Sequence, residues 1–187
     1  MDTLEKRLLQ LEINKILIAD DTPENLAAAR ELEKLLPRIK FDFFASGKEI
    51  TAAINRNPAA VDLVLTDLDM ETPKAGLDVL QMAWELRIPA LIISGGHKHH
   101  NQPIVKVVPA SCSVGCGGKN SIGTEKNVTT TWVKALEMFV KSCASPNDVI
   151  YPLLLLRKEM KKTGNKPPLD GFIGGQIRKF AERQLSL

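Results

Sequence analysis

Short apolar runs that end on acidic residues place the strongest constraint on the fold of this chain. Residues 15–19 (Lys-Ile-Leu-Ile-Ala) end on the pair Asp20-Asp21, and residues 62–66 (Asp-Leu-Val-Leu-Thr) end on Asp67. Runs that are apolar along their whole length are typical of parallel strands covered by helices on both faces. Because the carboxyl ends of parallel strands share one edge of a sheet, we expect the three carboxylates to lie close together.

Strand and helix patterns alternate along most of the chain. The predicted strands lie at residues 15–19, 40–45, 62–66, 89–93 and 104–108. The predicted helices lie at residues 3–12, 23–37, 47–57, 77–87, from 130 onward, 149–160, and last through Ile177, Phe180 and Leu185. This alternation predicts an α/β fold with a doubly wound, five-stranded parallel sheet. We expect an N-terminal helix (1–14), a main domain (15–145) and a C-terminal helical extension (146–187).

The composition sets limits on function without choosing one. The 187 residues suffice for one well-buried domain with an extension, and a charged share of 25% is ordinary for a globular protein. No apolar stretch reaches the roughly 18 residues of a membrane span, and three cysteines do not make a disulfide framework, so we expect a cytoplasmic protein without a membrane partner. The net charge of +3 gathers in the tail, where a solvated basic helix is expected rather than a nucleic-acid surface.

The acidic strand ends predict a particular chemistry. Three carboxylates at one edge repel one another, and a hard divalent cation held by oxygen ligands relieves that repulsion. We therefore expect Mg²⁺ at Asp20, Asp21 and Asp67, and chemistry on phosphate groups.

Three segments together resemble a response-regulator receiver domain, the phospho-accepting half of two-component signalling. They are Asp20-Asp21-Thr-Pro-Glu-Asn entering a helix, Thr66-Asp67-Leu-Asp69-Met70 followed by Pro73 and Gly76, and Ser94-Gly95 after a strand. The match covers roughly residues 15–96, with residues 130–142 as the final helix. The resemblance implies a flavodoxin-like fold and a phosphoprotein that acts in a phosphorelay with a histidine kinase or a phosphotransfer protein.

The resemblance also implies roles for particular residues. Asp67 becomes the phosphoryl acceptor, and Asp20 and Asp21 hold Mg²⁺ together with Asp67 and the backbone carbonyl of Asp69. The hydroxyl of Ser94 becomes the switch that binds the new phosphoryl group and moves its loop. Activity is then limited to self-phosphorylation from a phosphodonor and slow self-dephosphorylation.

The chain departs from the family pattern at three places. The family places a lysine at the end of its fifth strand, whereas Val108 stands here; we prefer Lys119 for this role over Lys106. Glu71 and Thr72 lengthen the loop after the acceptor, and Glu71 is a candidate to reach the metal or to repel the phosphoryl donor. The family's fourth helix has no counterpart between Ser94 and the fifth strand.

Two other functions stay open. A phosphohydrolase of the haloacid dehalogenase type also uses a strand-end Asp-x-Asp and a later Ser, which Asp67, Asp69 and Ser94 provide, but it leaves Asp20 and Asp21 without a role. A degenerate receiver would keep the fold and act as a non-phosphorylated interaction module. The terminal helices are candidates for forming a homodimer; the alternative is that they pack on their own domain.

A separate group of imidazoles and thiols follows the switch position. His97, His99 and His100, with Cys112 and Cys116, offer ligands that suit Zn²⁺. The alternative is a solvated loop over the active edge, whose histidines respond to pH or contact phosphate.

Overall fold

A central sheet organises the computed structural model, which describes residues 2–99, 102–108, 121–144, 149–168 and 175. Its strand order is β2-β1-β3-β4-β5-β6. The first four strands are parallel, and they are β1 (Lys15–Ala19), β2 (Lys40–Phe44), β3 (Leu63–Thr66) and β4 (Ala90–His99). Every residue of β3 is buried, as its continuous apolar sequence predicts. The expected α/β fold with a parallel sheet is therefore present.

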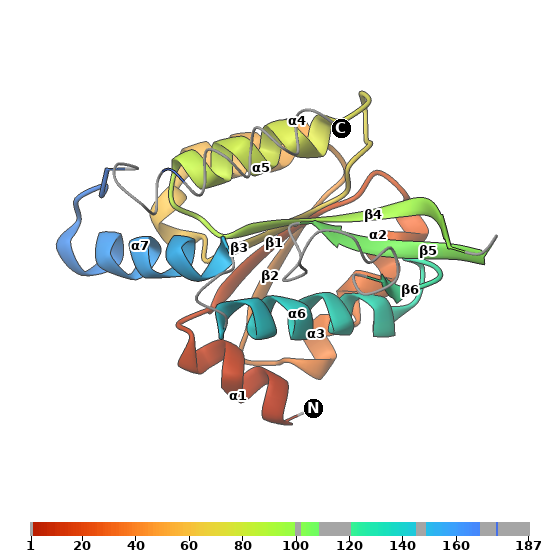
Figure 1. Cartoon of the computed structure of the whole chain (residues 1–187), viewed down its shortest axis with the longest axis horizontal. Helices are drawn as coiled ribbons and strands as arrows, with labels where there is room; N and C mark the ends of the chain where they lie inside the picture. The colour runs from red at the N-terminus through yellow and green to blue at the C-terminus, as the bar shows by residue number, and fades with distance from the viewer. Residues whose placement is uncertain (1, 100–101, 109–120, 145–148, 169–174, 176–187) are drawn as a thin grey trace.

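The prediction of a fifth parallel strand at residues 104–108 is wrong. β5 (Gln102–Val108) is antiparallel to β4, and β6 (Ser121–Gly123) is antiparallel to β5. β4 does not end at Ile93 but continues to His99, so β5 begins too soon afterwards for a parallel crossover, which needs about a dozen residues. The resulting hairpin projects at the right of Figure 1. Because two antiparallel steps restore direction, β6 runs the same way as β4.

Helices cover both faces of the sheet (Figure 1). One face carries α1 (Asp2–Gln10), α2 (Pro23–Arg30), α3 (Leu32–Leu35) and α6 (Thr129–Cys143); the other carries α4 (Gly47–Arg56) and α5 (Ala75–Glu85). Apart from the division of the predicted helix 23–37 into α2 and α3, these bounds lie within about two residues of the predicted ones. Among the described residues, no helix has both the length and the apolar character that crossing a membrane requires.

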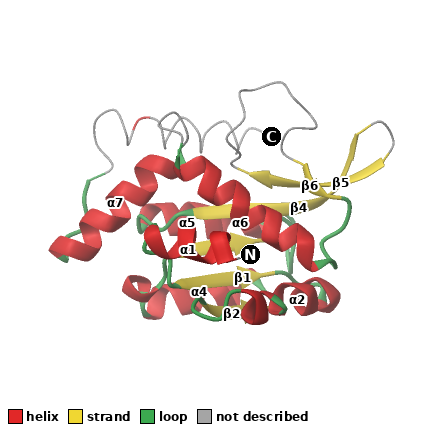
Figure 2. Cartoon of the chain, turned by 90° about the horizontal axis from the view of Figure 1, so that it is seen from below, coloured by secondary structure: helices red, strands yellow, loops and turns green. Residues whose placement is uncertain are grey.

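The C-terminal extension is fastened to the amino edge of the sheet, opposite the carboxyl edge. Its helix α7 (Ile150–Thr163) lies at the left of Figures 1 and 2, at the far end from the β4–β5 hairpin. The buried guanidinium of Arg157 donates to backbone carbonyls of the short 3-10 turn Pro58–Ala60 and of Val61. Lys161 pairs with Asp62, directly before β3. The last predicted helix, through Ile177 and Leu185, lies outside the described residues.

Candidate functional site

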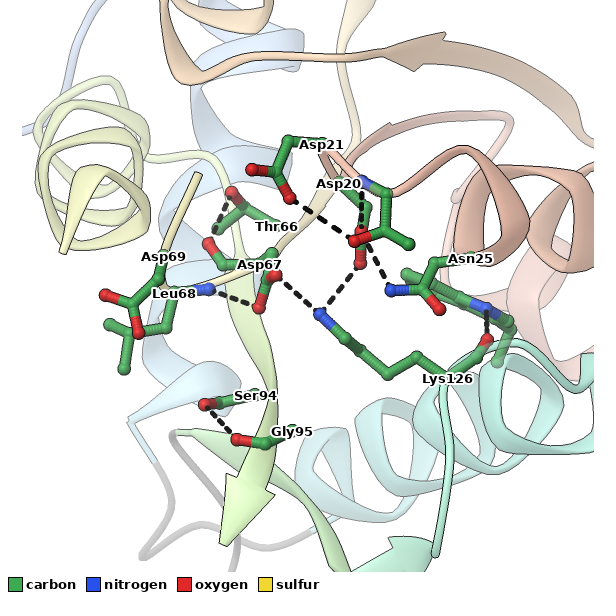
Figure 3. A network of polar contacts seen from close by, with 12 residues as sticks. Asp20, Asp21, Asn25, Thr66, Asp67, Leu68, Asp69, Ser94, Gly95 and Lys126 are labelled. Carbon is green, nitrogen blue, oxygen red and sulfur yellow. Dashed lines mark hydrogen bonds and ion pairs between the residues drawn. The ribbon is translucent and has the colours of Figure 1, made fainter. Parts of the chain in front are cut away.

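Three carboxylates meet at the carboxyl edge of the sheet, as the sequence predicts. One oxygen from each of Asp20, Asp21 and Asp67 lies within 4.8 Å of the others (Figure 3). Asp20 and Asp67 are buried, whereas Asp21 is exposed. Asp20 and Asp21 follow β1 and Asp67 follows β3, and these neighbouring parallel strands bring together residues that are distant in sequence.

Asp20 is held by the start of α2. Its Oδ1 accepts hydrogen bonds from the backbone N–H of Thr22 at 3.0 Å and from the side-chain Nδ2 of Asn25 at 2.9 Å. Both donors bind Oδ1, and Oδ2 pairs with the ammonium of Lys126. The sequence marks Asn25 as part of a helix start, and the structure adds that its buried amide orients an aspartate of the site.

Asp67 is fixed by the backbone that follows β3. Its Oδ1 accepts from the N–H of Leu68 at 2.7 Å, and its carbonyl accepts from the hydroxyl of Thr66 at 3.0 Å. The N–H of Gly76 donates to the Leu68 carbonyl at 2.9 Å, so the start of α5 lies against this turn. The turn at Asp67-Leu68 is therefore bonded both to the end of β3 and to the start of α5.

A lysine that the sequence analysis did not select completes the cluster. The Lys126 ammonium lies 2.8 Å from Asp20 Oδ2 and 2.6 Å from Asp67 Oδ2, with a side chain only 9% exposed (Figure 3). Lys126 lies at this position because β6 runs in the direction of the parallel strands and ends at Gly123, at the carboxyl edge of the sheet. Lys119, the lysine preferred from sequence, lies outside the described residues.

The charges of the cluster fit a divalent cation. When all groups are ionised, one ammonium offsets only one of the three negative charges of Asp20, Asp21 and Asp67. Carboxylate oxygens are hard ligands of the kind that Mg²⁺ prefers. The residues present therefore suit Mg²⁺ in both charge and donor type.

Burial makes ionisation of Asp67 costly. It raises the pKa of Asp67 above its ordinary value; Lys126 acts in the opposite direction, and the neighbouring Asp20 adds to the rise. The unfolded chain thus ionises more readily than the folded one. The charge of Asp67 therefore lowers stability at neutral pH, and this effect fades as the pH falls below the ordinary aspartate pKa.

Asp67→Asn is consequently expected to stabilise the fold at pH 7 when divalent cations are absent. The midpoint of thermal unfolding should rise, and the difference from wild type should shrink as the pH approaches about 4. Thermal unfolding in the presence of a chelator at several pH values measures this. A variant less stable than wild type at pH 7 would show that the pairing with Lys126 outweighs the cost of burial.

Ser94 and Asp69 lie near the cluster without joining it. The Ser94 hydroxyl is buried on β4, where the pairing with β5 shifts register, and it bonds the Gly95 carbonyl at 3.3 Å. The carboxylate of Asp69 points away from the three aspartates and accepts from the N–H of Lys74 at 2.8 Å (Figure 3). The expected contact between the Asp69 carbonyl and a metal stays a prediction.

Glu71, in the lengthened loop, is engaged elsewhere. Its carboxylate accepts from the backbone N–H groups of Gly47 at 2.8 Å and Lys48 at 3.0 Å, at the first turn of α4. Burial opposes its ionisation, but these hydrogen bonds prevail and hold the pKa of Glu71 below its ordinary value. Neither suggested role, metal ligand or repulsion of a donor, agrees with this position, because the carboxylate binds a helix N-terminus.

The predicted zinc ligands fall largely outside the described part of the chain. His97 and His99 belong to the outer part of β4, whereas His100, Cys112 and Cys116 lie beyond the described residues. The zinc site therefore stays a prediction.

Comparisons with known proteins identify no relative. No protein-family model, no curated protein and no solved structure matches the chain.

Proposed function

We propose that this chain is a phospho-accepting regulatory domain of the receiver type, with Asp67 as the acceptor. The observation that carries the proposal is the meeting of Asp20, Asp21 and Asp67 at one edge of the sheet, with the ammonium of Lys126 paired to Asp20 and Asp67. The receiver family combines an acidic pair, an acceptor aspartate and a lysine in this way. The four-stranded parallel part of the sheet agrees with the flavodoxin-like fold that the resemblance implies.

The groups present suit phosphoryl transfer to Asp67. A carboxylate oxygen of Asp67 attacks the phosphorus of a small donor, and the bond from phosphorus to the leaving group breaks as that group departs with the electron pair. Asp20 and Asp21, with Asp67, would hold Mg²⁺, which supplies positive charge to the phosphoryl oxygens. Lys126, already 2.6 Å from Asp67, is placed to bond a phosphoryl oxygen on the product, and Ser94 is the candidate switch.

The position of Asp69 argues against the hydrolase. That chemistry needs the second carboxylate of Asp67-Leu-Asp69 at the reacting group to exchange protons. Here the Asp69 carboxylate points away and is bonded to the backbone of Lys74. The hydrolase also gives no role to Asp20, whose buried carboxylate is the most thoroughly bonded of the cluster.

Intact-mass measurement after incubation with Mg²⁺ and a small phosphodonor tests the proposal. Wild type is expected to gain one phosphoryl group, Asp67→Asn none, and a chelator should abolish the adduct. Asp69→Asn is the matched control, because it neutralises a neighbouring aspartate whose side chain faces away from the site; it should form the adduct normally.

Each other result points to a different function. Sustained phosphate release that Asp69→Asn abolishes would identify the hydrolase. No adduct at saturating donor would identify a constitutive module, in which Lys126 serves as the permanent counter-ion of Asp20 and Asp67.

A further inference from the structure

The backbone of Lys126 is held in place by the first turn of α6. The buried indole of Trp132 donates from Nε1 to the Lys126 carbonyl at 2.8 Å. Beside it, the hydroxyl of Thr131 donates to the carbonyl of Glu125 at 2.6 Å. Two consecutive loop carbonyls are thus bonded by two consecutive residues of one helix.

The helix itself is anchored to the element that orients Asp20. The hydroxyl of Thr129 donates to the carbonyl of Ala28 in α2 at 3.1 Å. On the other side, the chain approaches the helix so closely that a Cβ on Gly123 would lie 2.5 Å from the Thr131 hydroxyl oxygen. The loop between β6 and α6 is therefore confined at both ends.

We infer that Trp132, with Thr131 beside it, is a positioning residue that sets the Lys126 ammonium between Asp20 and Asp67. A lysine side chain is long and flexible, and holding it between two carboxylates requires a fixed backbone origin. The chemical consequence of the inference rests on the proposed function: a displaced Lys126 would leave Asp67 able to bind a cation but slower to accept a phosphoryl group. Its structural consequence is independent of function.

Trp84 provides a matched control. It is also buried, and its indole donates to a backbone carbonyl, that of Ala90 at 3.4 Å. Ala90 begins β4 at the amino edge of the sheet, away from the carboxylates. Replacing either tryptophan with phenylalanine removes one indole N–H from the core, but only Trp132→Phe should affect Lys126.

The first experiment is a double-mutant cycle on stability, measured by urea unfolding in the presence of a chelator. Lys126→Met should be destabilising, because it leaves Asp20 and Asp67 without their counter-ion. In the Trp132→Phe background its effect on the unfolding equilibrium constant should be about three- to tenfold smaller, whereas in the Trp84→Phe background it should be unchanged. Additive effects of Trp132→Phe and Lys126→Met would overturn the inference. If Trp132→Phe does not fold, Thr131→Val replaces it in the same cycle.

The second experiment repeats the cycle on the rate of adduct formation at saturating Mg²⁺ and donor. Trp132→Phe should slow the reaction about three- to tenfold without weakening Mg²⁺ binding, and the double variant should be no slower than Lys126→Met alone. If the double variant is slower than Lys126→Met by the whole factor that Trp132→Phe causes alone, Trp132→Phe has a general structural defect and the inference is overturned. If the two substitutions are coupled in stability but wild type forms no adduct, the proposed function is refuted and the positioning role of Trp132 stands. If wild type forms the adduct but the effects on stability are additive, the positioning role is refuted and the proposed function stands.

Discussion

Replacing Gly76 with alanine is expected to destabilise the protein by about 3 kcal/mol. A Cβ at this position would lie 1.9 Å from the carbonyl oxygen of Asp67 and 2.8 Å from its carbonyl carbon. Both are backbone atoms, so no side-chain rotation relieves the overlap. Within a helix, glycine to alanine normally stabilises by up to about 1 kcal/mol, so a large loss would isolate the close contact between α5 and the turn at Asp67-Leu68.

Gly47→Ala is the matched control for this prediction. Its Cβ would approach only side-chain atoms, Glu71 Oε1 and Met70 Cε at 3.3 Å and Ala75 Cβ at 3.4 Å, so a small shift of these neighbours relieves the contacts. Urea unfolding should show a change within about 1 kcal/mol for Gly47→Ala. We also expect Gly76→Ala to lose adduct formation, since relief of the overlap must displace Asp67. Equal stabilities for the two variants would mean that the turn at Asp67-Leu68 moves aside without cost.

Arg157→Met is expected to cost about 3 kcal/mol, although it replaces a buried cation with an apolar side chain of similar length. The Arg157 Nη2 donates to the carbonyls of Pro58 at 2.5 Å and Ala59 at 3.0 Å, and also to that of Val61. Methionine would leave these buried acceptors without a donor. Burial lowers the pKa of Arg157, with Asp62 acting in the opposite direction. Its Nε and Nη1 have no hydrogen-bond partner in the described part of the chain, so relief of desolvation offsets part of the loss.

Lys158→Met, one position along the same helix, separates this effect from a general loss of positive charge. Lys158 pairs with Glu12 at 3.4 Å near the surface, where an ion pair contributes less than about 1 kcal/mol. Chemical denaturation of both variants should therefore show a large loss for Arg157→Met and a small one for Lys158→Met. An Arg157→Met variant as stable as wild type would mean that the cost of burying the guanidinium equals the value of its bonds.

The strands of the parallel core could be predicted because their sequences carry a burial signal. Apart from Lys15 at the start of β1 and Thr66 at the end of β3, both strands are apolar, and acids follow each of them. The direction of a strand cannot be predicted in this way, because an apolar run such as residues 104–108 has the same pattern whether it is parallel or antiparallel to its neighbour. The continuation of β4 through Gly95, Gly96 and His97 has no such pattern, since glycine and polar residues are poor strand formers. The hairpin that reverses β5 therefore had no local signal.

The aspartates of the site could be predicted from the sequence, whereas its lysine could not. The difference lies in the strands that precede them. Asp20 and Asp67 follow strands that the pattern identifies, whereas Lys126 follows β6, which has three residues and depends on its pairing with β5. Such a short strand lies below the length at which periodicity is informative. One signal could have identified it: Lys126 lies shortly before α6, and the chain that enters this helix passes the carboxyl edge of the sheet.

The middle strand β3 has an ion-paired aspartate at both ends, Asp62 with Lys161 at its entry and Asp67 with Lys126 at its exit. Every residue of the strand is buried, and the strand is hydrogen-bonded to β1 on one side and to β4 on the other. Helix α7 therefore contacts the entry of the same four-residue strand whose exit is followed by Asp67.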